Sequence, residues 1–188
     1  MRIISGSFKG KKILLPKDKL TRPLKDLTKE SIFNILKHSK LLNIELESSN
    51  ILDLFSGVGS FGLECLSRGA KNVTFLESYK EVLSVLKKNI NNLNQQNQTK
   101  VIEKDIFAEN TLKLLNDKFD IIFVDPPYKE KKLFFLLNAI TELELLNTNG
   151  IIIIHRHKKE EDYLPKEFNL ILEKNYGISK IIFGNILT

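Results

Sequence analysis

The residues best suited to carry out chemistry form the short run Asp125-Pro126-Pro127-Tyr128, which follows an apolar stretch at 121–124. The apolar stretch predicts a buried strand. Two consecutive prolines fix two φ angles and remove two backbone donors, so the strand must end in a rigid turn. Carbonyl oxygens of this turn and the Asp125 carboxylate would accept hydrogen bonds from an exocyclic amine, while the Tyr128 ring stacks on a planar base. The alternative is a loop that merely ends a strand, because short motifs often match by chance.

A second candidate site lies upstream, where the apolar stretch 51–54 leads through a glycine-rich turn into a predicted helix. Gly57, Gly59 and Gly62 give the spacing Gly-x-Gly-x-x-Gly, which two cofactor classes use. Asp53 distinguishes them, because a carboxylate four residues before Gly57 would repel the pyrophosphate of a dinucleotide. It would suit the ammonium and sulfonium of S-adenosylmethionine, which the backbone can approach closely at the glycines. The alternative for Asp53 is an acid that caps the helix or the turn.

Two further acids follow predicted strands. Glu77 lies about 20 residues beyond Gly57, where an acid is expected to bind ribose hydroxyls. Asp105 and Ile106 follow the next predicted strand, at a position that would meet an adenine amine. Ligands of open α/β sheets bind outside the carboxyl ends of the strands, so these residues would share one site with the two motifs above.

With these motifs, the sequence resembles the Rossmann-like amine methyltransferases that use S-adenosylmethionine. Its two ends narrow the resemblance to the RsmD family, and the similarity extends over nearly the whole chain. One position departs from the family pattern, since Leu27 stands after Asp26 where a basic residue is common. The segments that carry the narrower resemblance are 2–6, 9–12, 21–23, 29–34 and 176–180.

The RsmD family methylates the exocyclic N2 amine of one guanine in the 16S rRNA of the bacterial small ribosomal subunit, and it acts on assembled subunits as a monomer. The resemblance therefore implies S-adenosylmethionine as cofactor and small-subunit rRNA as partner. It implies a Rossmann-like α/β fold, with a seven-stranded, mostly parallel sheet and helices on both faces. It also implies three sets of site residues. These are Asp125, Pro126, Pro127 and Tyr128 for catalysis; Asp53, Phe55, Gly57, Gly59, Gly62, Glu77, Asp105 and Ile106 for the cofactor; and Arg2, Lys9, Lys11, Lys12, Arg22, Lys25 and Lys29 for RNA.

Positive charge is concentrated near the N-terminus. The 188-residue chain has a formal net charge of +6, and residues 1–40 hold 11 of its 29 Lys and Arg but 3 of its 23 Asp and Glu. A methyltransferase core needs no such excess to bind its cofactor. A polyanionic partner explains it, because Lys and Arg neutralise phosphates and release counterions. We therefore expect this segment to contact nucleic acid; a basic surface that only keeps the protein in solution is the alternative.

The composition argues against membrane, secreted, disulfide-bonded and zinc-binding proteins. No apolar stretch is long enough to span a membrane, and the first residues lack the apolar segment of a secretory signal, so we expect a cytoplasmic protein. Cys65 is the single cysteine, which excludes an internal disulfide, and its place in the helix after the glycine turn predicts a small buried residue. No Cys/His cluster has zinc spacing, so no metal is expected. The run His-Arg-His-Lys-Lys at 155–159 is interpreted as a solvated loop.

The sequence pattern predicts two parts. Residues 1–40 form a basic, RNA-contacting extension, with a β-hairpin at 2–15 and a helix at 26–38 that packs partly through Leu27. Residues 41–188 form the methyltransferase domain, whose alternating strands and helices predict a parallel sheet covered on both faces. The predicted strands are 51–54, 73–77, 100–103, 120–124 and 150–154, the predicted helices are 60–68, 80–92, 106–115 and 130–145, and a terminal antiparallel hairpin occupies 168–187.

Three other functions remain open from the residues alone. The same chemistry on another amine, such as adenine N6 or a protein glutamine, would use the same two motifs. An NAD-dependent oxidoreductase would use the glycine-rich turn and would bind NADH instead of S-adenosylmethionine. A non-catalytic RNA-binding protein would share the basic segment, but it has no need of the intact run from Asp125 to Tyr128.

Overall fold

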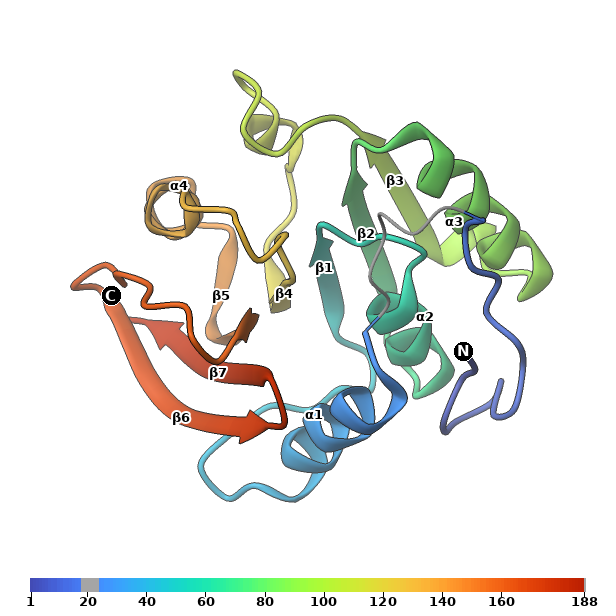
Figure 1. The fold of residues 1–188 in the computed structure, drawn as a ribbon, viewed down its shortest axis with the longest axis horizontal. Helices are drawn as coiled ribbons and strands as arrows, with labels where there is room; N and C mark the ends of the chain where they lie inside the picture. Colours follow the sequence, from blue (N-terminus) through green and yellow to red (C-terminus); the bar gives the residue numbers. More distant parts are fainter. Residues whose placement is uncertain (18–23, 188) are drawn as a thin grey trace.

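Seven strands form one mixed sheet in the computed structural model, which describes residues 1–17 and 24–187 (Figure 1). The strand order is β3-β2-β1-β4-β5-β7-β6, and β7 runs antiparallel to both of its neighbours. The strands are β1 (Asn50–Leu54), β2 (Asn72–Glu77), β3 (Thr99–Glu103), β4 (Phe119–Val124), β5 (Leu146–His157), β6 (Phe168–Tyr176) and β7 (Ser179–Ile186). The helices are α1 (Asp26–His38), α2 (Ser60–Ser67), α3 (Lys80–Asn92) and α4 (Leu133–Glu142), with 3₁₀ turns η1 (Gln96–Gln98) and η2 (Leu112–Leu114). The strand order reverses between β1 and β4, which is where sheets of this kind bind ligands.

Side chains of the central strands alternate between two cores. Ile51 and Phe123 belong to the core that includes residues of α1, α2 and α3, whereas Leu52 and Ile122 belong to the core that includes residues of α4. Figure 1 shows α4 on the opposite side of the sheet from α2 and α3. Strands that are covered on both faces read as continuous apolar runs, which explains why β1 and β4 are recognisable in the sequence. Among the described residues, no helix is long and apolar enough to cross a lipid bilayer.

The N-terminal extension packs on the core that contains α1, α2 and α3. The β-hairpin predicted at 2–15 is reduced to one antiparallel bridge between Arg2 and Lys12. The reason is that the segment turns toward α2, where the Ser7 N–H donates to the Ser67 carbonyl at 2.7 Å. The extension keeps a short pairing of its own, in which the Ile3 N–H donates to the Lys11 carbonyl at 2.9 Å and the Ile13 N–H to the Met1 carbonyl at 3.0 Å, and its turn is hydrogen-bonded to the domain.

The helix predicted at 106–115 is wrong, and only the turn η2 forms there. The Phe107 N–H donates to Asp105 Oδ1 at 2.9 Å, and Asn110 has a φ of 62°. Both features divert the backbone from a helix, since the side-chain bond makes a local turn and a left-handed residue breaks the helical ladder.

The ends of two other elements also differ from the prediction. α4 is shorter than the predicted 130–145 helix, because Glu144 adopts a φ of 49° just after it ends. β5 continues beyond the predicted end at residue 154 to His157, because β7 pairs with these last residues. The terminal hairpin that completes the seven-stranded sheet is confirmed. Leu27, predicted to help α1 pack, is instead 70% exposed.

Candidate active site

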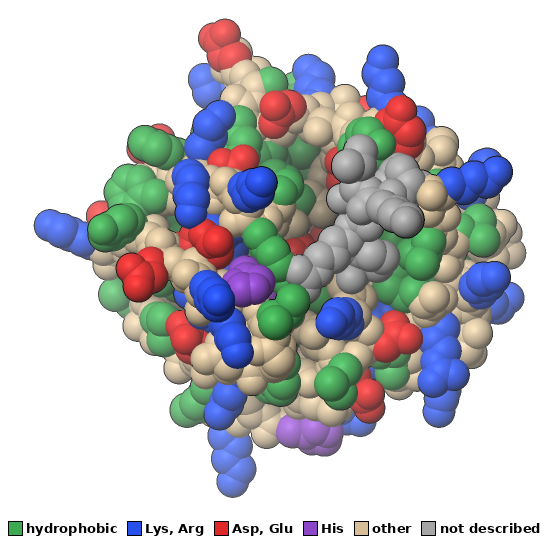
Figure 2. Space-filling view, in the orientation of Figure 1, with side chains coloured by type: hydrophobic (Ala, Val, Ile, Leu, Met, Phe, Trp, Pro, Cys, Tyr) green, Lys and Arg blue, Asp and Glu red, His purple; other side chains and the backbone are tan. Residues whose placement is uncertain are grey.

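A cavity of about 600 Å³ lies at the carboxyl ends of β1, β2, β3 and β4, and it opens on the face shown in Figure 2. It brings together side chains from four strand ends, as the positions of the acids in the sequence predict. The predicted site residues that line it are Asp53, Phe55, Gly57, Glu77, Asp105, Asp125, Pro126, Pro127 and Tyr128. Gly59, Gly62 and Ile106 do not line it.

The end of β2 holds the glycine-rich turn in place. One oxygen of the Glu77 carboxylate accepts the Gly57 N–H at 2.8 Å, and the other accepts the N–H groups of Ser78 and Tyr79. Gly57 has a φ of 56°, which a glycine adopts without steric penalty. The oxygen that accepts the Gly57 N–H takes only this one bond and keeps a second lone pair, so Glu77 can fix this turn and still accept a hydroxyl from a ligand.

The last glycine of the motif serves the packing of α2 against the sheet. A Cβ at Gly62 would lie 2.4 Å from the Phe75 ring and 2.7 Å from the Val73 side chain. Its N–H donates to Asp53 Oδ2 at 3.0 Å. Gly62 therefore lets the helix approach β2 closely and holds the Asp53 carboxylate, without itself contacting the cavity.

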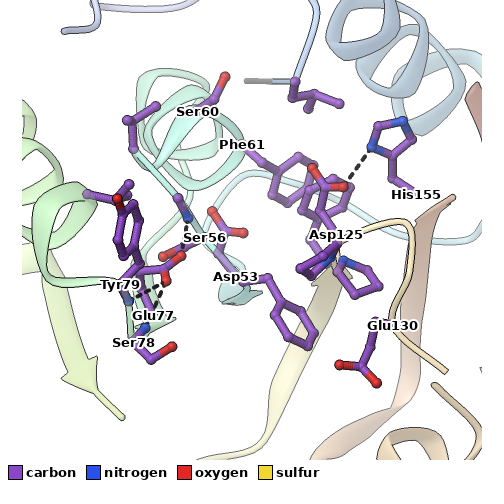
Figure 3. Close-up of a pocket in the computed structure, with 18 of the residues that line it drawn as sticks. Asp53, Ser56, Ser60, Phe61, Glu77, Ser78, Tyr79, Asp125, Glu130 and His155 are labelled. Carbon is purple, nitrogen blue, oxygen red and sulfur yellow. Dashed lines mark hydrogen bonds and ion pairs between the residues drawn. The ribbon is translucent and has the colours of Figure 1, made fainter. Parts of the chain in front are cut away.

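Asp53 is an acid at the floor of the cavity with 1% exposure. Burial raises its pKa well above the usual range, and the nearby charges of Asp125 and Glu77 raise it further, against the hydrogen bond from Gly62. Asp53 lies between Glu77 and Asp125 in Figure 3. These three acids and two others that line the cavity, Asp105 and Glu130, favour a cationic ligand, and S-adenosylmethionine, with its ammonium and sulfonium, fits this requirement.

Two phenylalanines form an apolar wall of the same cavity. The Phe55 and Phe107 rings lie 5.9 Å apart between centroids, and both line the cavity. Phe55 has a φ of 57°, a left-handed value that bulky residues rarely adopt, so the chain turns sharply out of β1 at this point. Ile106, which the sequence proposes for the cofactor, is 5% exposed and packs in the core on the α4 side. The turn at Asp105 directs the next side chain, Phe107, into the cavity instead.

The turn after β4 is held from behind by a buried arginine. Arg156 is fully buried, and its guanidinium donates to the carbonyls of Pro127 at 3.3 Å and Glu130 at 2.9 Å. The same group makes an ion pair with Asp162 at 2.7 Å. The Pro126 carbonyl accepts no hydrogen bond from the described part of the chain, so it remains available to a ligand.

The interpretation of residues 155–159 as a solvated loop is wrong for its first three residues, which belong to β5, and the first two of them are buried. His155 is 5% exposed and Arg156 is 0% exposed, because β5 extends through them and pairs with β7. His155 lines the cavity, and its ring makes a hydrogen bond to Asp125 (Figure 3). Local sequence gives no signal for either residue, since their burial depends on a strand that lies more than 20 residues downstream.

The residues proposed to contact RNA differ in their exposure. One of them, Lys29, is buried. Five are exposed: Arg2, Lys9, Lys11, Lys12 and Lys25. Arg22 lies outside the described residues.

Lys29 corrects that proposal. It is 0% exposed, it donates to the Arg2 carbonyl at 2.8 Å, and it lies 3.4 Å from the Glu64 carboxylate. Its charge is used inside the protein, so Lys29 does not belong to a nucleic-acid surface. Cys65 is buried as predicted, and burial raises the pKa of its thiol well above the ordinary value, which makes it a poor nucleophile.

The reversed last strand of the seven-stranded sheet and the acid-lined cavity at the strand ends define a Rossmann-like class I methyltransferase, the class that uses S-adenosylmethionine as methyl donor. The family model described as "Conserved hypothetical protein 95" matches residues 1–185. The chain belongs to this family, which is the RsmD family that the sequence resembles.

Individual relatives agree with this assignment. The chain is 33% identical to a putative rRNA methyltransferase, YlbH of Bacillus subtilis, over 186 residues that cover 96% of each protein. It is 32% identical to the ribosomal RNA small subunit methyltransferase D of Haemophilus influenzae, over 95% of this chain and 90% of that one. The solved structure of a putative methyltransferase, yhhF of Escherichia coli, superposes with a TM-score of 0.81 at 26% identity, covering 100% of this chain and 98% of the other. The predictions of the fold and of a methyltransferase are thereby confirmed.

Proposed function

We propose that this protein transfers a methyl group from S-adenosylmethionine to the exocyclic N2 amine of one guanine in small-subunit rRNA, the nucleotide at position 966 of 16S rRNA. The observation that carries the proposal is the placement of Asp125, at a rigid turn, in the same cavity as the buried Asp53. The names of the relatives support rRNA as the substrate class. The assembled small subunit, which exposes the folded rRNA, is the proposed form of that substrate.

The cofactor would lie over the ends of β1, β2 and β3. Asp53 would hold the cationic amino acid part, Glu77 the ribose, and Asp105 the adenine amine, with Phe55 and Phe107 against the adenine ring. When bound, S-adenosylmethionine supplies an electrophilic methyl group on a positively charged sulfur. The Phe55 and Phe107 rings, together with the buried Asp53, would limit the access of water to the cofactor.

The chain's own contribution to the reaction would be orientation. The lone pair of a guanine N2 amine is delocalised into the ring, so the amine is a weak nucleophile. The Asp125 carboxylate and the Pro126 carbonyl would each accept one amine proton and so direct the lone pair at the methyl group. After transfer, the surplus proton would leave to Asp125 or to water. Orientation of this kind can contribute several kcal/mol of barrier reduction.

The target base must leave its stack to reach this cavity. Asp125 is only 22% exposed, and N2 points into the minor groove of a paired helix. The base would therefore be unpaired or flipped, with the half-buried Tyr128 stacked on it. The exposed lysines of the N-terminal extension, Lys9, Lys11 and Lys12, would neutralise neighbouring phosphates.

One experiment tests cofactor, reaction and substrate together. The protein is incubated with radiolabelled S-adenosylmethionine and small ribosomal subunits that lack the modification, and the labelled nucleoside is identified by mass after digestion. Label in N2-methylguanosine is the expected result. Label in another nucleoside would retain the methyltransferase and overturn the guanine assignment. Binding of S-adenosylmethionine without label would direct the search to DNA and protein amines, and binding of NADH in its place would support an oxidoreductase.

A further inference from the structure

A buried chain of three side chains begins at Asp125 and leads away from the cavity. His155 Nδ1 lies 2.8 Å from Asp125 Oδ1, and His155 Nε2 lies 2.9 Å from the hydroxyl of Ser179 (Figure 3 shows the first of these bonds). His155 is 5% exposed and Ser179 is 2% exposed, whereas the Asp125 side chain is 22% exposed. Both Asp125 and His155 border the cavity, but Asp125 is the more accessible to a substrate.

With Asp125 ionised and the His155 ring neutral, hydrogen-bonding rules allow one arrangement of the protons. An ionised carboxylate is an acceptor only, so His155 Nδ1 must carry the hydrogen that is donated to Asp125. In a neutral imidazole the other nitrogen is then an acceptor, and it accepts the hydrogen of the Ser179 hydroxyl. Ser179 can therefore select the tautomer of His155, and His155 can hold one oxygen of Asp125.

Neighbouring strands hold the three groups in this geometry. Asp125 follows β4, His155 lies in β5 and Ser179 begins β7, and these strands are adjacent in the sheet. Regular strand pairing leaves little freedom for any of the three side chains to move relative to the others. The Asp125 carboxylate is consequently pinned through one oxygen, and its second oxygen is left for a group in the cavity.

We propose that His155 is a positioning residue of the methyl transfer, which holds Asp125 through a δ-protonated ring set by Ser179 so that one carboxylate oxygen faces the substrate amine. This inference rests on the proposed function of the cavity. A loosely held Asp125 would reach the amine in fewer of its rotamers, and a misplacement of about 1 Å can reduce a rate by about 100-fold. No other described residue donates a hydrogen bond to the Asp125 carboxylate.

Three variants test this role in the labelled-methyl assay. His155→Leu removes the donor and should lower kcat by about 10- to 100-fold. His155→Asn keeps an N–H near the Nδ1 position and should recover most of that loss. Ser179→Ala keeps the ring but frees its tautomer, and it should lower kcat less than His155→Leu does. The Kd for S-adenosylmethionine should remain within about twofold in all three, because the cofactor is assigned to Asp53 and its neighbours.

If His155 only supported the fold, its variants would behave differently. If His155→Asn is as slow as His155→Leu, or if the affinity for S-adenosylmethionine falls as much as kcat does (Kd rises in proportion), the positioning role is overturned. His38→Asn, at an exposed position at the end of α1, is the matched control and should change nothing. Should His155→Leu fail to fold, Ser179→Ala and His155→Asn still decide the outcome.

A second measurement does not depend on the substrate. Nitrogen NMR of histidine-labelled protein distinguishes the two tautomers of a neutral imidazole ring. The His155 signals, assigned by their loss in His155→Asn, should show hydrogen on Nδ1 and none on Nε2. Hydrogen on Nε2 would overturn the inference, whatever the protein methylates. Hydrogen on Nδ1 in a protein that leaves rRNA unlabelled would contradict only the proposed function.

Discussion

Lys29 Nζ lies 3.4 Å from Glu64 Oε2, and neither side chain has any exposed surface. The Glu64 carboxylate also accepts the N–H groups of Ile4 and Ser5 at 2.8 and 2.9 Å and the Arg68 Nε–H at 2.8 Å. Burial lowers the pKa of Lys29, and the charge of Glu64 opposes that shift. The pair therefore fastens the N-terminal segment and α1 to α2, beside the glycine-rich turn.

The two members of this pair should not be equally important for stability. Glu64→Leu leaves a buried ammonium and two buried N–H groups without their acceptor, so the free energy of unfolding should fall by about 3–5 kcal/mol. Lys29→Met leaves Glu64 with its bonds from Arg68 and the backbone, so the loss should be smaller, about 1–3 kcal/mol. Urea unfolding of both variants measures this difference. Equal losses would mean that Glu64 does not anchor the N-terminal segment.

Residues that act within a short stretch of chain could be predicted from the sequence. The strands β1 and β4 are mostly apolar, Asp53 is the last residue but one of β1, and Asp125 directly follows β4. The shift from Ile106 to Phe107 could not be predicted, because it depends on how one side chain turns the backbone.

Burial that depends on distant partners was not predictable either. Lys29 looks like any other lysine of a basic segment, and its acceptor Glu64 lies 35 residues further along the chain. His155 and Arg156 look like part of a polar loop until β7 pairs with them. In each case a polar side chain is satisfied by a contact that only the tertiary fold creates, and periodicity carries no information on it.

At neutral pH the Asp53 carboxylate should make the ligand-free protein less stable than a variant with an uncharged side chain at this position. Its pKa is raised by burial, so the folded protein retains a proton that the unfolded chain releases above the ordinary pKa of 3.8. The stability contributed by this proton is present at low pH and is lost as pH rises through the raised pKa. Asp53→Asn can still accept the Gly62 N–H, and it should raise Tm at neutral pH by about 2–4 °C, which is ~1 kcal/mol for a chain of this size. Calorimetry without ligand measures the change in Tm. An unchanged or lower Tm would mean that the buried Asp53 carboxylate does not destabilise the folded protein.

Binding of S-adenosylmethionine should release a proton from the same group. A cationic ligand favours the charged form of Asp53, so the affinity should increase as pH rises toward the raised pKa and then level off. Titration calorimetry in two buffers with different ionisation enthalpies counts the protons released. Asp53→Asn should bind about 10- to 100-fold more weakly, since a charge-assisted contact is lost, and should release no proton. Undiminished proton release in this variant would assign the titration to another residue.

Arg156 should be more important to the active-site turn than its charge alone suggests. Its planar guanidinium reaches the Pro127 and Glu130 carbonyls and the Asp162 carboxylate at once, which the single ammonium of a lysine cannot do. Arg156→Lys should lower the free energy of unfolding by about 1–3 kcal/mol and should lower kcat more than it changes the Kd of S-adenosylmethionine. Lys158→Arg, the same exchange in reverse at an exposed neighbour, is the control. If kcat of Arg156→Lys matches the wild type, the contacts of the Arg156 guanidinium do not position the turn after β4.

The exposed lysines of the N-terminal extension should account for much of the salt dependence of RNA binding. Changing Lys9, Lys11 and Lys12 together to glutamine should weaken binding, because each phosphate contact that is lost removes about 0.7–0.9 from the slope of log K against log salt concentration.

The control for this triple change is a matched set of three lysines at the opposite edge of the sheet. Lys71, Lys100 and Lys118 are exposed near the amino ends of β2, β3 and β4, away from the cavity at the carboxyl ends. Their replacement by glutamine removes the same charge and should leave the slope nearly as it is. Filter binding to small-subunit rRNA at several salt concentrations measures both sets. If the two sets reduce the slope equally, the RNA responds to net charge, and the extension has no special place in the binding surface.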